Sequence, residues 1–160
     1  MADTPRDSMI RNIATLGGCL RYLSLALAAL CLAGCATHRV LAPATLYERL
    51  GSMPAIEALV EDFVAQVEAD GRINGFFAQS NRPRLKRWLA EFLCVSTGGP
   101  CKYTGRPMGE GHRDMGITGA DFTALVEDLV KSMDRLGVPA QERQELLALL
   151  GPMRADIVSR

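Results

Sequence analysis

Apolar side chains recur at helical spacing along almost the whole chain from Ala44 onward. Residues three and four apart share one face of an α-helix, so this spacing predicts helices that bury one side. Four such stripes can be followed, namely Ile56, Leu59, Val60, Phe63, Val64 and Val67; Leu85, Trp88, Leu89, Phe92 and Leu93; Phe122, Leu125, Val126, Leu129, Val130 and Met133; and Leu146, Leu147, Leu150, Met153 and Ile157. No run shows the alternation of apolar and polar residues that is typical of a strand. The pattern predicts an all-α domain over residues 44–158.

Residues that favour helix ends mark the boundaries of these stripes. The candidates are Ser52 as an N-cap with Pro54 in the first turn, Asn81 with Pro83, Thr118 with Asp121 three residues later, Gly137 as a stop, and Pro139 before the last stripe. The pair Thr118 and Asp121 resembles a capping box, in which each residue bonds to the backbone of the other.

The segment from Ser96 to Gly116 has no helical stripe and contains six glycines and two prolines. An irregular stretch of this length in a compact domain is usually functional or disordered. It contains His112, one of only two histidines in the chain. We expect this loop to help hold a flat ligand between the helices on either side of it.

Cys94 and Cys101 stand seven residues apart and flank the turn residues Gly98, Gly99 and Pro100. In an oxidising compartment this spacing allows a small-loop disulfide. Two unrelated free thiols are the equal alternative. The spacing does not fit a zinc site, because no complementary pair of histidines accompanies it.

The N-terminal region carries a charge-free apolar run from Tyr22 to Gly34, preceded by Arg11 and Arg21. A basic flank followed by such a short run is typical of a secretory signal and too short for a comfortable membrane span. The run ends in Leu-Ala-Gly before Cys35, which resembles a bacterial lipobox. We therefore expect a lipoprotein signal peptide over residues 1–34 and a lipidated N-terminus with a spacer over residues 35–43, facing the periplasm and held in the outer membrane. The alternatives are an uncleaved anchor and a cysteine that stands at this place by chance.

The overall charge is balanced, with 18 Lys+Arg against 18 Asp+Glu in 160 residues. Hydrophobic residues make up 48% and charged residues 22%, which excludes bulk disorder, collagen-like repeats and coiled-coil rods. Without a basic excess there is no electrostatic driving force for non-specific binding of nucleic acid. We expect no nucleic-acid partner.

Several segments together are similar to the truncated haemoglobins, and most of all to group I. They read LYERLGSMPAIEALVEDF, INGFF, GGPCKYTGRPM and HRDMGIT, and the similarity extends from Leu46 to Val158. The resemblance implies a two-over-two helical sandwich around haem. It also implies that His112 is the proximal ligand of the haem iron. Imidazole is the usual proximal ligand in globins, and its other ring nitrogen needs an acceptor that sets the tautomer.

The same resemblance assigns further residues to the haem. The apolar candidates are Phe76, Phe77, Leu85, Leu89, Met108, Ile117 and Phe122, and the candidate partners of the propionates are Lys86, Arg87 and Tyr103. Ordinary core packing accounts for the apolar residues equally well. A solvated helix face is the alternative for the basic residues.

The distal side departs from the group I pattern. Many members have a tyrosine after the Glu-Asp-Phe triplet and a glutamine on the next long helix, where this chain has Val64 and Leu89, with Leu85 one turn earlier. A hydrogen-bond donor stabilises bound oxygen by roughly 1.5–3 kcal/mol. We therefore expect this pocket to hold oxygen less tightly than tyrosine-bearing relatives, unless Gln66 or Gln79 substitutes as donor. A second departure is Ser52, where paired glycines are frequent in the family.

The expected function is reversible binding of oxygen, nitric oxide or carbon monoxide by a lipid-anchored haem protein. Nitric oxide dioxygenation is the enzymatic alternative, and it needs a separate reductase because the chain has no dinucleotide-binding glycine motif. Peroxidase-like chemistry wants a distal acid or base, which Val64, Leu85 and Leu89 do not supply. A haem-free envelope lipoprotein that acts as an interaction module is the remaining alternative.

Overall fold

The computed structural model describes residues 43–158. The chain divides into two units at the junction of Ala42 and Pro43, and only the second unit is described here. The predicted signal peptide, Cys35 and the spacer up to Ala42 therefore lie outside the described residues. Between residues 43 and 158, no helix combines the length and the apolarity needed to cross a membrane.

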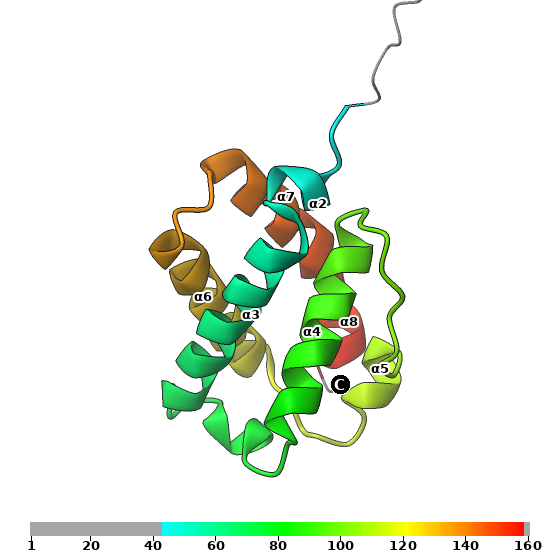
Figure 1. Cartoon of the computed structure of the whole chain (residues 1–160). Coiled ribbons are helices and arrows are strands. Elements are labelled where there is room, and N and C mark those ends of the chain that lie inside the picture. Colours follow the sequence, from blue (N-terminus) through cyan, green and yellow to red (C-terminus); the bar gives the residue numbers. More distant parts are fainter. Residues whose placement is uncertain (1–42, 159–160) are drawn as a thin grey trace, which may run out of the picture. The chain divides into compact units, whose positions relative to one another are not determined.

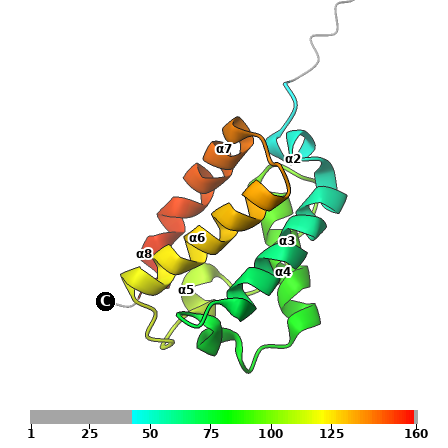
Figure 2. The ribbon, with the colours of Figure 1, turned by 90° about the vertical axis from the view of Figure 1, so that its left-hand side faces the viewer.

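All regular structure in the described unit is helical. The elements are α2 (Leu46–Arg49), α3 (Ser52–Ala69), η1 (Asn74–Phe77), α4 (Arg82–Ser96), α5 (Met108–Gly111), α6 (Gly119–Arg135), α7 (Ala140–Leu150), η2 (Gly151–Met153) and α8 (Arg154–Ile157), where η denotes a 3₁₀ helix. Helix α3 packs against both α4 and α6 (Figure 1). Helix α6 runs beside α7 and its continuation α8 (Figure 2). The two pairs form a two-over-two sandwich, which confirms the predicted fold class.

Two of the predicted helix starts are confirmed in detail. Asn81 caps α4, and its side-chain oxygen accepts a hydrogen bond from the backbone N–H of Arg84 at 3.0 Å. At the start of α6, the hydroxyl of Thr118 accepts from the backbone N–H of Asp121 at 3.2 Å, and the carboxylate of Asp121 accepts from the backbone N–H of Thr118 at 2.8 Å. These hydrogen bonds hold the pKa of Asp121 below its usual range. Gly137, with a φ of +66°, follows the end of the same helix as predicted.

The predicted N-cap at Ser52 is wrong. Gly51 occupies the cap position with a φ of +102°, Ser52 follows with a φ of +62°, and no side chain caps the helix. A capping side chain needs an extended backbone, whereas the tight turn between α2 and α3 requires two successive left-handed residues. A Cβ atom at Gly51 would approach that of Ala55 to 2.9 Å. The turn thus has a steric need for glycine at its first position and imposes a strain on the order of 1 kcal/mol at Ser52.

The last apolar stripe is interrupted. Helix α7 ends at Leu150, and η2 separates it from α8. Pro152 has no N–H to donate and its ring obstructs the preceding helical turn, so an uninterrupted α-helix cannot pass through it. The break turns α8 toward α5, with which it is in contact.

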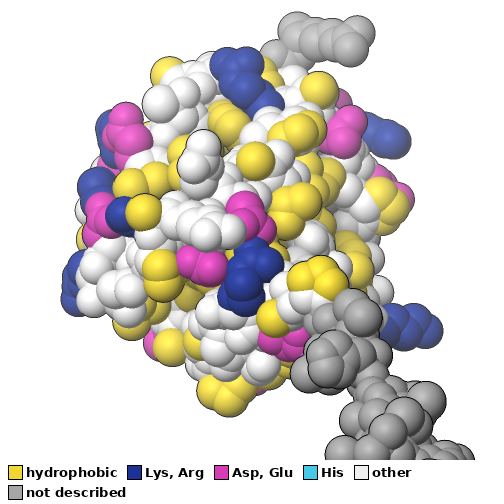
Figure 3. All heavy atoms as spheres, turned by 90° about the horizontal axis from the view of Figure 1, so that it is seen from above, with side chains coloured by type: hydrophobic (Ala, Val, Ile, Leu, Met, Phe, Trp, Pro, Cys, Tyr) yellow, Lys and Arg dark blue, Asp and Glu magenta, His cyan; other side chains and the backbone are white. Residues whose placement is uncertain are grey.

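The buried core lies among the long helices. Its most deeply buried side chains include Ile56 and Val60 of α3, Cys94 of α4, Met133 of α6 and Leu146 of α7. Each of these, apart from Cys94, belongs to a predicted apolar stripe. The surface in Figure 3 shows basic and acidic side chains among hydrophobic ones, in keeping with the balanced composition.

The structure joins Cys94 and Cys101 in a disulfide, with their Cα atoms 6.0 Å apart, and so decides between the two alternatives. Further contacts tie the same loop to α4. The ring of Tyr103 packs edge-on against Phe92 at 5.5 Å, and the backbone N–H and the hydroxyl of Thr104 both donate to Glu91 at 2.9 and 2.6 Å. The glycine-rich loop is therefore fixed along α4 over its first half.

Candidate functional site

A large cavity of about 670 Å³ opens inside the helical unit. Its walls come from α3, η1, α4, the loop after α4, α5, α6 and the segment from α7 to α8, and most of the lining side chains are aliphatic or aromatic. The volume falls within the range of cofactor and small-molecule sites. The cavity is the principal candidate for the binding site that the glycine-rich loop predicted.

His112 contributes an imidazole to the cavity wall. It directly follows the short helix α5, and its backbone N–H donates to the carbonyl oxygen of Met108 at 3.1 Å. Nδ1 of the imidazole lies 2.8 Å from the same oxygen. A carbonyl oxygen only accepts, so Nδ1 carries a proton, and in the neutral ring the lone pair then lies on Nε2. This is the tautomer that a metal-ligating histidine needs.

The apolar residues that the family resemblance assigned come together here. Those that line the cavity are Phe76, Phe77, Leu85, Leu89, Met108, Ile117 and Phe122. They are separated by up to 46 positions in the chain, and they reach one cavity through four different elements and the Ile117 junction. Tyr103 also lines it, and burial raises the pKa of its hydroxyl, which donates to the carbonyl oxygen of Arg106 at 2.9 Å.

The basic residues differ from the expectation. Lys86 does not line the cavity, because its Nζ donates to Glu61 of α3 at 2.6 Å, and Arg87 lies 3.7 Å from Glu91 on its own helix. The cations that line the cavity are Arg106 of the loop and Arg154 of α8. Both are exposed, so they lie where the cavity meets solvent.

Sequence reasoning missed these two arginines for different reasons. Arg106 stands alone in an irregular loop, and Arg154 belongs to the helix that Pro152 turns back toward the cavity. The guanidinium of Arg154 lies 5.9 Å from the ring centre of Phe122, within reach of a cation–π contact. In the sequence, only the length of the irregular loop indicated that the region around Arg106 takes part in binding.

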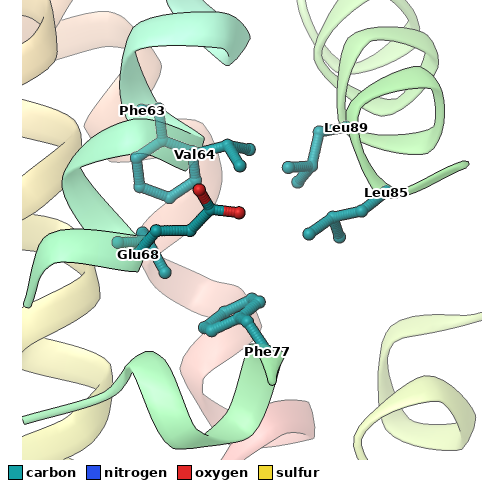
Figure 4. A pocket seen from close by; sticks show the side chains of 7 residues that line it. Phe63, Val64, Glu68, Phe77, Leu85 and Leu89 are labelled. Carbon is teal, nitrogen blue, oxygen red and sulfur yellow. The ribbon is translucent and has the colours of Figure 1, made fainter. Parts of the chain in front are cut away.

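The three residues of the predicted distal side meet in a smaller pocket between α3 and α4 (Figure 4). Its lining consists of Phe63, Val64, Val67, Glu68, Phe77, Leu85 and Leu89. Four of these, Phe63, Phe77, Leu85 and Leu89, also line the large cavity, so the two spaces are neighbours. Val64 is buried, and it lines the smaller pocket but not the large cavity.

The distal pocket has no hydrogen-bond donor among its lining side chains. Gln66 and Gln79, the substitutes left open by the sequence, line neither space. The amide of Gln66 instead donates to Asp62 at 3.4 Å. The polar side chain that does reach the pocket is Glu68, which the apolar stripes could not reveal because it lies outside them.

An imidazole on an apolar cavity wall, with cations at the rim, defines a helical protein suited to a flat, anionic cofactor whose metal takes a histidine ligand. The model of the bacterial-like globin family matches residues 45–159. The chain belongs to this family, and haem is its cofactor.

Individual relatives agree with this assignment. The group 1 truncated hemoglobin GlbN of Mycolicibacterium paratuberculosis is 36% identical over 124 residues, which are 78% of this chain and 91% of that protein. GlbN of Synechocystis is 36% identical over 111 residues, which are 67% and 90% of the two chains.

Solved structures show the same architecture. The Fe(III) form of truncated hemoglobin from Tetrahymena pyriformis has a TM-score of 0.70 at 31% identity and covers 73% of this chain and 100% of its own. The 2/2 hemoglobin from Synechococcus sp. PCC 7002, in the cyanomet state with covalently attached heme, has a TM-score of 0.69 at 32% identity with the same coverage.

The residues present fit haem. Nε2 of His112 is available to ligate the iron, the aromatic and aliphatic side chains match a flat apolar ring, and Tyr103, Arg106 and Arg154 offer a hydroxyl and two cations to the propionates.

Replacing His112 with glycine is expected to abolish the Soret band of the purified haem-loaded domain, because no other described histidine can ligate the iron. Added imidazole is expected to restore the band, since it fills the space that the side chain leaves. His38→Ala, which removes the other histidine of the chain, serves as the control. It is expected to leave the spectrum unchanged, with a five-coordinate ferrous form. A Soret band that survives in His112→Gly without imidazole contradicts the assignment.

Neutralising either rim arginine, as Arg106→Gln or Arg154→Gln, is expected to speed haem loss about two- to fivefold, as expected for one exposed ion pair. Haem transfer to apomyoglobin measures the rate. Lys86→Gln is the matched control, and its rate should equal that of the wild type because Lys86 pairs with Glu61. Faster haem loss in Lys86→Gln, with wild-type rates in the two arginine variants, would contradict this prediction and support the propionate role that the family resemblance assigns to Lys86.

Proposed function

We propose that this protein reversibly binds diatomic gases, namely oxygen, carbon monoxide and nitric oxide, at a haem held by His112. Haem supplies an iron that coordinates such gases. The observation that carries the proposal is the hydrogen bond from Nδ1 of His112 to the carbonyl oxygen of Met108, which leaves Nε2 to ligate the iron. Membership of the globin family supports the same function and argues against the haem-free interaction module.

The distal pocket distinguishes among the gases because its side chains provide no hydrogen-bond donor. Oxygen gains most from a neighbouring hydrogen-bond donor, and Val64, Leu85 and Leu89 provide none. The loss of one such hydrogen bond, roughly 1.5–3 kcal/mol, changes dissociation by at least about tenfold. We therefore infer weak retention of oxygen, with less effect on carbon monoxide and nitric oxide.

Weak retention of oxygen also bears on the enzymatic alternative. Nitric oxide dioxygenation consumes the oxygen-loaded protein and needs electrons from a separate reductase. A pocket that releases oxygen quickly keeps this form scarce, so the geometry favours gas binding over turnover. The acid-base side chain that lines the distal pocket is Glu68, and its ion pair with Arg82 disfavours the proton transfer that peroxidase chemistry requires.

We further propose that the protein is anchored through a lipid on Cys35 and faces the periplasm from the outer membrane. The lipobox-like sequence before Cys35 supports the anchor. The disulfide between Cys94 and Cys101 supports an oxidising compartment, because such bonds are rare where thiols are kept reduced.

The oxygen dissociation rate tests the distal pocket. Leu89→Gln introduces a donor into the lining of both spaces, and we expect it to slow dissociation about tenfold or more, measured by stopped-flow displacement with carbon monoxide. Leu89→Met is the matched control of similar volume without a donor and should leave the rate near that of the wild type. A slow wild-type rate that Leu89→Gln does not alter would refute the proposed lack of a donor.

Metabolic labelling with palmitate tests the anchor. The full chain produced in a bacterium is expected to take up label and to sediment with the membranes, and Cys35→Ser is expected to lose both. Cys31→Ser lies four residues earlier in the same apolar run and should behave as the wild type. Labelling that persists in Cys35→Ser would show that the lipid is not attached there.

A further inference from the structure

The Cys94–Cys101 disulfide closes the first part of the loop that leads from α4 to α5. The chain leaves the end of α4 and turns back along the same helix to α5 (Figure 1). Downstream of Cys101, Tyr103 and Arg106 line the large cavity, and His112 directly follows α5. The bond between the two sulfurs therefore fixes the start of the segment that supplies the haem ligand and two candidate partners of the propionates.

The two cysteines lie in different surroundings. Cys94 is fully buried, at 0% exposure, among the side chains of the main core. Cys101 is half-buried and packs against that core from the loop. A thiolate in solvent therefore has access to the disulfide at Cys101 and not at Cys94. Such access helps to decide which sulfur of a disulfide is attacked.

The space beside Cys94 is already filled. The backbone N–H of Gly99 donates to the carbonyl oxygen of Cys94 at 2.7 Å. A Cβ atom at Gly99 would lie 2.5 Å from Sγ of Cys94 and 2.6 Å from the ring of Tyr47. Two unbonded sulfur atoms need more room than two bonded ones. Because Cys94 belongs to a long helix in the core, the loop has to move outward when the bond is broken.

The contacts that remain after reduction lie closer to the surface. Thr104 donates from its backbone N–H and its hydroxyl to Glu91, and both hydrogen bonds are exposed. The ring of Tyr103 packs edge-on against Phe92. Residues 97–107 include three glycines, which give a released loop wide conformational freedom. The long helices keep their own apolar core, so we expect reduction to free the loop without unfolding the domain.

We propose that the Cys94–Cys101 disulfide is a thiol–disulfide exchange site and that its reduction by a dithiol protein releases the loop and weakens the hold on haem. The attacking thiolate forms a bond to Sγ of Cys101, the bond between the two cysteines breaks, and Cys94 leaves as a thiolate that takes up a proton. The second thiol of the dithiol then displaces Cys101 in the same way. The dithiol becomes a disulfide, and the two cysteines receive two electrons and two protons. Haem binding is required for this control, whereas the proposed gas binding and the lipid anchor are not.

Haem transfer to apomyoglobin measures the hold on haem in the oxidised and the reduced protein. The test uses the full haem-loaded chain with Cys19→Ser, Cys31→Ser and Cys35→Ser, which leaves Cys94 and Cys101 as its cysteines. Dithiothreitol reduces the bond and is then removed without oxygen. We expect haem loss to be about two- to tenfold faster after reduction, the effect of one lost hydrogen bond or ion pair at the propionates. Reoxidation with oxidised dithiothreitol is expected to restore the slow rate.

Cys101→Ser provides the matched control. It keeps the buried thiol of Cys94 but prevents the disulfide, so it should lose haem at the rate of the reduced protein and should not respond to dithiothreitol. Thr104→Val removes a hydrogen bond to Glu91. It is expected to speed haem loss more in the reduced protein than in the oxidised one, because this contact still holds the loop after the disulfide is broken.

Amide hydrogen exchange distinguishes a local release of the loop from a general loss of stability. We expect reduction to speed exchange in residues 97–111 and to leave α3 and α6 unchanged. Equal rates of haem loss in the oxidised and reduced proteins overturn the proposal. Faster exchange throughout the helices also overturns it, because the disulfide would then only stabilise the fold. A disulfide that dithiothreitol does not reduce in the folded protein, as shown by the absence of maleimide labelling, contradicts the exchange site itself.

Discussion

The hydrogen bond from Nδ1 of His112 to the carbonyl oxygen of Met108 is the contact on which haem binding depends. It sets the tautomer of the neutral ring and leaves Nε2 to ligate the iron. The loop that leads to this imidazole is in turn held to α4 by the Cys94–Cys101 disulfide and by the hydrogen bonds that Thr104 donates to Glu91. Helix α4 also carries Leu85 and Leu89, so one helix supports both these distal residues and the loop that leads to His112.

Charge is confined to the edges of the cavity. Burying an unpaired charge is costly. The ionic groups that line the two spaces are Arg106 and Arg154, both exposed, Asp121, which is half-buried and bonded to Thr118 at the start of α6, and Glu68, which is paired with Arg82. Between these edges the walls are apolar. Apolar walls with charged edges suit a cofactor whose ring is apolar and whose propionates are anionic. The apolar walls also suit small apolar gases as ligands.

The amino-acid pattern predicted the helical elements well because their determinants are local. The stripes of α3, α4 and α6 and the caps at Asn81 and Thr118 depend on residues within a turn or two of one another. Where a local rule failed, a neighbouring element was responsible. The turn from α2 forces Ser52 into a left-handed conformation, which no preference of serine for helix caps could reveal.

By itself, the sequence determined the all-helical class, the apolar faces of the long helices and, through a motif around it, the importance of His112. Only the tertiary structure decided that Lys86 pairs with Glu61, that Arg106 and Arg154 line the cavity, that the two cysteines are joined, and that Glu68 of the distal pocket pairs with Arg82. Helical periodicity reports which side of a helix is buried, because it repeats every few residues. Which charged side chain finds which partner depends on how distant helices cross, and that is settled only when the whole chain packs.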